Sequence, residues 1–516
     1  MNGAEALVRT LAAADVTVCF ANPGTSEMQL VAAIGADDGM RSVLGLFEGV
    51  VTGAADGYFR IKGKPAATLL HLGPGLANGL SNLHNAKRAR SAILNIIGDH
   101  ALYHRALDAP LTSDIETVAK PFSKWVRMAE SIDTVSGDAL AALRAAVSGV
   151  PGPVSLIIPA DIAWTEGAKP ATPQALPERA KPDAARVTAI AKALSAAGSK
   201  GMLLLGGFSA TKKGLAAAGR IRAKTGARLV GDFFLNKAAF GAGTVQLPRM
   251  PYFGEQAIEV LKGLETLVLV ESKAPVSFFA YPGKPSVLTD PATAVRHLAH
   301  PEEDGEAALE ALADELGAPR EPADVLGANL PAAPDAGALS ADSAAKIISR
   351  ALPDGAIVVN EAITSGFFLM LYLGGAAPHD IFDQMGGSLG YGLPAAVGAA
   401  IAAPDRKVVC PVGDGSAMYT VQALWTMARE KLDVLSIVFA NRSYGILNFE
   451  MSRVGAQNPG PKALSMLAID NPELGFTHLA QGMGVEAARA TTVGEFQNLV
   501  TRAMRMRGPF LIEAVI

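Results

Sequence analysis

Short apolar runs alternate with amphipathic helical patterns along most of the chain. In the first third of the sequence, the apolar runs lie at residues 16–20, 67–70, 92–97 and 154–158. Apolar runs of that length between helical patterns are typical of βαβ units, whose parallel strands are joined by crossover helices. We therefore expect residues 1–168 to fold around a mostly parallel sheet.

The same alternation returns in two further stretches. The central stretch has apolar runs at residues 202–205, 267–270 and 285–288. The last stretch has such runs at residues 356–359, 408–412, 435–440 and 510–516. Both stretches should therefore contain parallel sheets as well.

Two segments of different composition separate these stretches. Residues 169–183 are rich in Pro and charged side chains, and residues 318–339 are rich in Pro, Ala and Gly, which is typical of linkers. A chain of 516 residues also exceeds one ordinary hydrophobic core. The sequence therefore predicts an α/β fold with three doubly wound parallel-sheet domains, at residues 1–168, 184–317 and 340–516.

Composition narrows the class of protein. Half of the residues are apolar, 18% are charged and the formal net charge is −4, so we expect no nucleic-acid partner. The chain has no apolar run of membrane-spanning length, and Glu5 and Arg9 interrupt its first residues, which predicts a cytoplasmic protein without a membrane partner. Cys19 and Cys410 lie in apolar runs and should be buried thiols, and the eight histidines show no spacing typical of a structural zinc site.

The apolar run at 408–412 leads into Gly413-Asp414-Gly415-Ser416 and then a helical pattern. Free N–H groups at a helix start, next to glycines that allow close approach, suit a diphosphate. Asp414, at the end of the expected strand, suits the divalent cation that would bridge such a diphosphate. A Gly-Asp-Gly sequence alone is also compatible with an ordinary left-handed turn.

The next apolar run, at 435–440, ends in Asn441-Arg442-Ser443-Tyr444-Gly445. Asn441 follows Asp414 by 27 residues, about one crossover through a helix, so the two residues should meet at neighbouring strand ends. Oxygen ligands for Mg²⁺ would then come from the Asp414 carboxylate, the Asn441 amide, a backbone carbonyl near Ser443 and the phosphate groups.

One carboxylate, Glu48, lies in the apolar run 44–51, which continues into Ala-Ala-Asp-Gly-Tyr at 54–58. Desolvation in such a run favours the protonated carboxyl group, which can hydrogen-bond a heteroaromatic nitrogen. The alternative is a glutamate at a helix N-terminus, stabilised by the helix dipole.

Further candidates follow other expected strands. Thr25 lies in the turn Asn-Pro-Gly-Thr-Ser-Glu at 22–27, and His71 precedes a glycine turn, where a structural histidine is the alternative. Thr364 and Ser365 follow the run at 356–359 and offer hydroxyl and N–H groups to a diphosphate. Leu389 is the one bulky aliphatic side chain among the small residues at 386–392, where it could wedge against a ligand or start a tightly packed helix.

Together these motifs resemble the thiamine diphosphate (ThDP)- and magnesium-dependent decarboxylases and acetolactate synthases. The resemblance implies that Glu48 binds N1′ of the cofactor's aminopyrimidine and that Leu389 enforces its V shape. It implies metal ligation by Asp414, Asn441 and the Ser443 carbonyl, with Tyr444 and Gly445 completing the cofactor motif. Ala440 replaces the first Asn of the family's Asn-Asn pair, and Phe47 stands where many members have His.

The resemblance also implies a reaction. Thr25 matches the hydroxyl residue that faces the substrate carboxylate in benzoylformate decarboxylases, and His71 matches their active-site histidine. The expected activity is decarboxylation of a small 2-oxo acid through an enamine, which is released as an aldehyde or ligated to a second carbonyl. The second histidine of that group is absent from residues 272–283, where Phe278 and Phe279 stand.

Alternatives to this reaction are open. One is an acetolactate synthase-type carboligase, although His71 and the absence of Gln-Trp-Gln after Tyr444-Gly445 argue against standard acetolactate synthesis. Another is a non-catalytic ThDP-binding assembly subunit. The pair Gly206-Gly207 does not establish FAD binding. The family architecture implies a homodimer or homotetramer, in which Glu48 of one subunit meets the diphosphate-binding domain of another.

Ile446 and Leu447 follow Tyr444-Gly445 and are expected in the substrate pocket. Benzoylformate decarboxylases have a small residue at the position of Ile446. Because a branched side chain is stiff and fills volume, the sequence predicts a preference for short or unbranched aliphatic 2-oxo acids.

Overall fold

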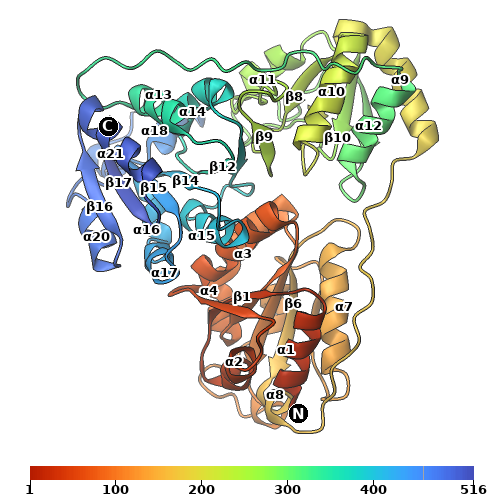
Figure 1. Cartoon of the computed structure of the whole chain (residues 1–516), viewed down its shortest axis with the longest axis vertical. Helices are drawn as coiled ribbons and strands as arrows, with labels where there is room; N and C mark the ends of the chain where they lie inside the picture. The colour runs from red at the N-terminus through yellow and green to blue at the C-terminus, as the bar shows by residue number, and fades with distance from the viewer. Residues whose placement is uncertain (457) are drawn as a thin grey trace.

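The computed structural model describes residues 1–456 and 458–516. The chain folds into three α/β units, each built on its own sheet (Figure 1). The first unit lies below, and the central and third units lie side by side above it. Residues 169–183 and 318–339 contain neither helix nor strand, and the longer of these connections crosses the top of the picture between α12 and α13.

The first unit contains a six-stranded parallel sheet with the order β2-β1-β3-β4-β6-β5. Its strands are β1 (Val18–Asn22), β2 (Arg41–Leu44), β3 (Ala66–Leu70), β4 (Ile93–Asp99), β5 (Val126–Met128) and β6 (Val154–Pro159). Its helices are α1 (Gly3–Ala13), η1 (Thr25–Glu27), α2 (Met28–Gly35), α3 (Glu48–Lys62), α4 (Leu72–Ala89), α5 (Leu102–Arg105), α6 (Ile115–Ala119), α7 (Val135–Val147) and α8 (Ala160–Trp164). Because β2 and β3 lie on opposite sides of β1, the strand order switches between β1 and β3, where ligands of such sheets bind.

The central unit contains a four-stranded parallel sheet with the order β11-β10-β7-β8. Its strands are β7 (Gly201–Leu205), β8 (Arg228–Gly231), β10 (Thr266–Val270) and β11 (Ala294–Ala299). The helices are α9 (Ala184–Ala197), η2 (Gly198–Lys200), α10 (Lys212–Thr225), α11 (Gly254–Leu261) and α12 (Gly305–Glu315).

The third unit contains a seven-stranded sheet with the order β16-β17-β15-β14-β12-β13-β9. Its strands are β9 (Ala238–Phe240), β12 (Ala356–Asn360), β13 (His379–Asp383), β14 (Val408–Gly413), β15 (Val434–Ala440), β16 (Glu486–Ala490) and β17 (Phe510–Val515). The helices are α13 (Ala341–Ala351), α14 (Gly366–Tyr372), η3 (Leu373–Gly375), α15 (Gly392–Ala402), α16 (Asp414–Tyr419), α17 (Ala423–Arg429), α18 (Gly445–Arg453), α19 (Pro461–Ser465), α20 (Phe476–Gly482) and α21 (Val493–Arg505). This order switches between β12 and β14.

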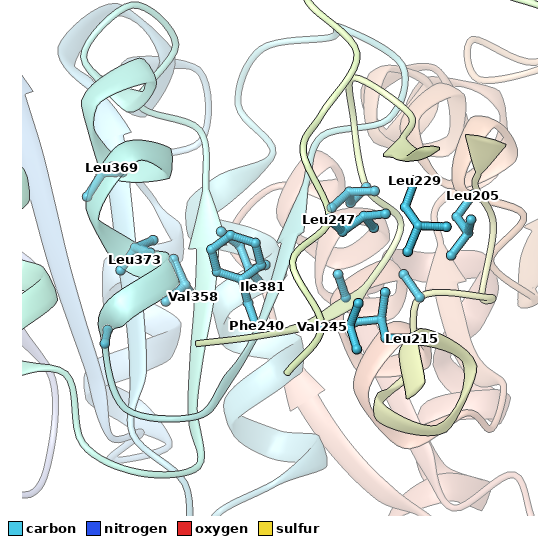
Figure 2. Packing of buried hydrophobic residues seen from close by; sticks show 14 of the residues in the cluster. Leu205, Leu215, Leu229, Phe240, Val245, Leu247, Val358, Leu369, Leu373 and Ile381 are labelled. Carbon is cyan, nitrogen blue, oxygen red and sulfur yellow. The ribbon is translucent and has the colours of Figure 1, made fainter. Parts of the chain in front are cut away.

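Strand β9 joins the central and third units. It comes from the central stretch but pairs antiparallel with β13, in a sheet that is otherwise parallel. Figure 2 shows Phe240 of β9 beside Ile381 of β13, in one buried cluster that continues to Leu229 and Leu205 of the central sheet. The two units therefore share a hydrophobic core.

Helices α3 and α15 join the first unit to the third through small residues. A Cβ atom on Gly398 of α15 would overlap the Ala54 carbonyl oxygen of α3, and one on Gly57 would overlap the Ala395 carbonyl oxygen. Only glycine allows backbones to approach this closely. The contact fixes the N-terminus of α3, which carries Glu48, relative to the start of α15.

The structure can be compared with the expected architecture, the expected buried cysteines and the apolar run at residues 285–288. The three-unit α/β architecture is confirmed, and both cysteines are buried and free. The apolar run at residues 285–288 forms no strand of the central sheet: Val287 is 64% exposed and makes an isolated bridge, and β11 takes the place beside β10. Among the described residues, none of the helices is both long and apolar enough to span a bilayer.

Candidate functional site

His71 and the turn after β1 meet at the switch point of the first sheet. His71 Nδ1 lies 2.7 Å from Oε2 of Glu27, a fully buried carboxylate. Glu27 also accepts hydrogen bonds from the Gly24 N–H at 2.7 Å and the Ser26 hydroxyl at 2.6 Å. Since the carboxylate holds Nδ1, Nε2 is the ring nitrogen available to a ligand.

The two neighbouring hydroxyls of this turn differ in their surroundings. Thr25, the residue expected from the sequence, begins η1 and is exposed. Ser26 Oγ lies 3.4 Å from His71 Nδ1. Glu27 and Ser26 were not singled out from the sequence, because a Glu three residues after Gly24 at a helix start looks like an ordinary capping residue.

Glu48 is the first residue of α3, the helix N-terminal position that one interpretation of the sequence expected. Its side chain is 7% exposed, and Asn78 of α4 donates a hydrogen bond to Oε2 at 3.0 Å. A buried carboxyl group with one oxygen held by an amide leaves the other oxygen for a ligand nitrogen. Asn78 carried no recognisable signal in the sequence.

Asp414 and Asn441 follow the neighbouring strands β14 and β15, and Asp414 borders the switch point between β12 and β14. Asp414 begins α16, and its Oδ2 accepts the Arg442 N–H at 2.7 Å while Oδ1 accepts the Gly415 N–H at 2.8 Å. Burial raises the pKa of Asp414. The turn is tight, since Arg442 has φ +58° and the Ser443 N–H donates to Asn441 Oδ1 at 3.1 Å.

The oxygen atoms of Asp414, Asn441 and the neighbouring backbone suit a hard cation. In residues 1–456 and 458–516, no group of three or more His, Cys, Asp or Glu side chains could hold a metal ion. A cation at Asp414 would therefore draw on neutral oxygens, namely the Asn441 amide and a backbone carbonyl, and on phosphate oxygens of a ligand. Carboxylate, carbonyl and phosphate oxygens are the set that Mg²⁺ prefers.

Other cofactor candidates surround this turn. Gly445 lies against Thr364, with Thr364 Oγ1 and Asn441 Nδ2 each within 3.4 Å of the position of an added Cβ. Ser365 is buried at the start of α14. A Cβ on Gly415 would overlap the ring of Tyr444, whose pKa burial raises. Gly413 and Ser416 flank Asp414 at the end of β14 and in α16.

The loop that carries Leu389 is anchored from two sides. Glu361, 1% exposed, accepts N–H groups of Gly390, Tyr391 and Gly392 at distances from 2.6 to 3.2 Å, and burial raises its pKa to about 7. Asn82 of α4 donates to the carbonyl oxygens of Gly49 at 2.8 Å and Gly390 at 3.1 Å. The residue after Glu48 and the residue after Leu389 are thus held by one side chain.

A cavity of about 600 Å³ opens between the central and third units. Three of the residues expected from the sequence line it, namely Leu389, Ile446 and Leu447. Thr25, Glu48 and His71 do not line it. One chain therefore presents two groups of candidate residues, one on the first unit and one around Asp414 and the cavity.

The side chain of Glu271 occupies the space beside the glycine turn Gly206-Gly207, which follows β7. Glu271, fully buried at the end of β10, accepts the N–H groups of Phe208 and Gly305 at 3.0 Å each, and Arg179 pairs with both of its oxygens. A Cβ on Gly207 would overlap this carboxylate. Two backbone N–H groups beside this glycine turn, those of Phe208 and Gly305, are thus already bonded to Glu271.

Two family models match the parts of the chain that carry these two groups of residues. Residues 1–118 match the thiamine pyrophosphate enzyme N-terminal TPP binding domain, and residues 365–514 match the C-terminal TPP binding domain. The chain is 49% identical over 517 residues to a Mycobacterium tuberculosis protein provisionally named acetolactate synthase large subunit IlvX, covering 100% of this chain and 99% of that protein.

Two further relatives carry the names of decarboxylases. The chain is 30% identical to the benzoylformate decarboxylase of Pseudomonas aeruginosa, with 96% of each chain covered. The solved structure of a Rhodococcus jostii thiamine diphosphate-dependent 4-hydroxybenzoylformate decarboxylase superposes with a TM-score of 0.84 at 25% identity, covering 100% of this chain and 99% of that one.

Proposed function

Because the chain belongs to the thiamine diphosphate-dependent enzymes of the acetolactate synthase and benzoylformate decarboxylase family, we propose that it decarboxylates a 2-oxo acid with ThDP and Mg²⁺. The proposal covers both release of an aldehyde and ligation to a second carbonyl compound. The residues described above suit the two ends of the cofactor.

The residues around Asp414 would hold the diphosphate and its cation, with Thr364, Ser365 and Gly445 beside them. Leu389 would support the bent cofactor, and Glu48 would hold a proton at the pyrimidine nitrogen. When bound, ThDP supplies a nucleophilic carbon and accepts the electron pair left by departing carbon dioxide. The protein contributes position, exclusion of water and proton transfer.

The observation that carries the decarboxylase proposal is the contact between His71 and Glu27. A buried carboxylate within hydrogen-bond distance of Nδ1 fixes the orientation of the imidazole, as in other carboxylate–histidine pairs. His71 could then hold or move a proton at Nε2. A positioned histidine fits protonation of a reacting oxygen or carbon better than it fits a purely structural role.

Carboligation is the second candidate. The 49% identical relative bears the name of an acetolactate synthase large subunit, which favours attack on a second carbonyl compound. Aldehyde release and carboligation would use the same residues of the chain. They differ in whether a proton or a second carbonyl compound reacts after carbon dioxide leaves. Because decarboxylation is common to both reactions, only analysis of the products separates them.

We further propose that the active site forms between two copies of the chain. Glu48 does not line the cavity of its own chain, and large apolar side chains near both groups are exposed, with Leu46 at 46%, Tyr103 at 71% and Tyr419 at 53%. A homodimer, alone or paired into a tetramer, would cover them and bring Glu48 to the other copy's Asp414.

The proposal is tested by incubating the purified chain with ThDP, Mg²⁺ and a panel of 2-oxo acids, while carbon dioxide, aldehydes and 2-hydroxyketones are measured. We expect cofactor-dependent carbon dioxide release, reduced roughly 10²- to 10⁴-fold in His71→Ala, the usual scale for a positioned proton-transfer group. Equal rates in wild type and His71→Ala would remove the role given to His71. ThDP binding without any carbon dioxide release would favour the non-catalytic assembly subunit.

A further inference from the structure

The wall of the cavity on the central unit is aromatic. Phe233 and Phe234 follow β8, and the ring of Phe278 packs against them with centroids 5.8 and 5.5 Å away. Tyr252 lies 5.4 Å from Phe233 and 4.9 Å from Phe278. These rings support one another in edge-to-face or tilted contacts, so the wall is preformed and suits a planar apolar group.

The cavity extends from Ile446, Phe367 and Met370 to the aromatic wall. Its volume of about 600 Å³ includes the space beside Leu389 that the cofactor would fill. The expectation of a short aliphatic substrate considered Ile446 alone. Because the aromatic wall comes from residues distant in sequence, the size of the cavity was not visible from that position.

One carboxylate of the cavity differs from the others in its partners. Asp383 is paired with Arg249 at 2.6 Å, and both oxygens of Glu361 accept backbone N–H groups. Among residues 1–456 and 458–516, Glu450, on α18 one helical turn beyond Ile446, accepts only hydroxyl groups within hydrogen-bond distance. Arg453, which is nearby on the same helix, stacks on Phe253 and Tyr281 and pairs with Glu255.

Glu450 retains acceptor capacity in this position. Tyr252 donates to Oε1 at 2.9 Å and Tyr281 donates to Oε2 at 2.8 Å. A carboxylate has about four lone-pair sites, so each oxygen can still accept one more hydrogen bond. Burial and Glu450 raise the pKa of Tyr252, which therefore keeps its proton and remains a donor.

We propose that Glu450 selects the substrate, and that the preferred 2-oxo acid carries a large planar acyl group with a hydrogen-bond donor at its far end. The proposal rests on the proposed function, because it names the substrate class of the same site. The planar group would lie on the aromatic wall, and its donor would complete the hydrogen bonds of Glu450. A desolvated acceptor rejects an analogue that cannot donate, because the carboxylate then loses water without compensation.

Three phenylpyruvates that differ only at the para position test this: the parent acid, the 4-hydroxy acid and the 4-methoxy acid, which has the oxygen but no donor. We expect kcat/KM of the holoenzyme for the 4-hydroxy acid to exceed that for the other two by at least about tenfold. In Glu450→Leu this ratio should fall to about 1. Tyr281→Phe is the matched control, because it removes a partner of Glu450 that does not line the cavity, and it should keep a ratio well above 1.

A second readout does not depend on turnover. Calorimetric binding of the same three acids to ThDP-loaded Glu48→Gln protein should show the same order of affinity, and Glu450→Met, which also has no acceptor oxygen, serves if the leucine variant fails to fold. Equal kcat/KM and equal affinity for the 4-hydroxy and 4-methoxy acids would overturn the assignment of Glu450. Absence of carbon dioxide release from every acid, with selective binding intact, would overturn the proposed function and leave the recognition by Glu450 standing.

Discussion

Glu361 has a carboxyl group that is buried under the loop bearing Leu389 and bonded to three backbone N–H groups. Its pKa in the folded protein is about 7, against 4.5 for an ordinary glutamate. Below pH 4.5 the group is protonated in both the folded and unfolded states. Between pH 4.5 and 7 the folded state holds a proton that the unfolded state has lost. The stability that this protonated carboxyl group contributes is fully present below pH 4.5 and is lost as pH rises through 7.

Glu361→Gln removes that titration while keeping the size of the side chain. We expect the melting temperature of the wild type, relative to that of Glu361→Gln, to fall as pH rises from 5 to 8. Thermal unfolding in matched buffers measures it. A difference that is constant across this range, or that moves in favour of the wild type, would contradict the raised pKa.

Asp414 supplies the one carboxylate of the expected metal site. Asp414→Ala should weaken Mg²⁺-dependent ThDP binding by more than about tenfold, since even an indirect partner of a metal ligand contributes a factor of that size. Asp405→Ala, an exposed aspartate of the same unit, is the matched control. Calorimetry that gives the same cofactor affinity for both variants would remove Asp414 from the site.

Some residues of this site could be identified from the sequence, and others could not. Asp414, Asn441 and Leu389 could be named because each lies in a local motif next to an expected strand. Glu27, Asn78 and Glu450 could not, because their roles come from contacts with residues 30 to 198 positions away. Contacts between distant segments leave no local pattern in a single sequence.

At the scale of elements, the pairing of α3 with α15 positions Glu48. Gly398→Ala places a methyl group on the Ala54 carbonyl oxygen, so the two helices must separate. We expect a loss of roughly 1 to 3 kcal/mol in unfolding free energy, the usual scale of overpacking. Gly137→Ala is the control, because this helical glycine of α7 has open space around it, and it should gain about 0.5 to 1 kcal/mol.

Denaturant unfolding of both variants checks this expectation. Equal stability of Gly398→Ala and wild type would mean that the helices can part without cost, and that the position of Glu48 does not depend on their contact. A gain in the control together with a loss at Gly398 would locate the effect at the interface of the two helices.

Elements differed in how well the sequence predicted them. Buried parallel strands such as β4, β14 and β15 were found to within two residues, because strands covered on both faces are continuous apolar runs. The edge strand β11 was missed, since exposed residues such as Arg296 interrupt its pattern. β9 was missed because three residues that cross to another unit's sheet produce no periodicity.

At the scale of the whole molecule, the three units meet at one buried arginine. Arg60 of α3 forms a bidentate pair with Asp56 and donates to the carbonyl oxygens of Asp383 in the third unit and Asn236 in the central stretch. A buried ion pair with further backbone bonds favours one relative placement of the units. Each chain can therefore present its two groups of site residues in a fixed arrangement to a second copy.

That arrangement is tested by mixing two inactive variants. Glu48→Gln and Asp414→Ala should each have little activity, but a hybrid dimer would contain one site with both changes and one site with neither. We expect about half of the wild-type activity per hybrid dimer. If native mass spectrometry shows hybrids and no activity returns, both residues act within one chain.

The proposed function requires that the chain activate ThDP and not merely bind it. Hydrogen–deuterium exchange at C2 of the cofactor measures this without any knowledge of the substrate. With Mg²⁺ and saturating ThDP, we expect the wild-type chain to accelerate the exchange over free cofactor, and Glu48→Gln to lose roughly 10²- to 10⁴-fold in rate while still binding it. Exchange at the rate of free ThDP, with the cofactor bound to the wild-type chain, would contradict the proposed function.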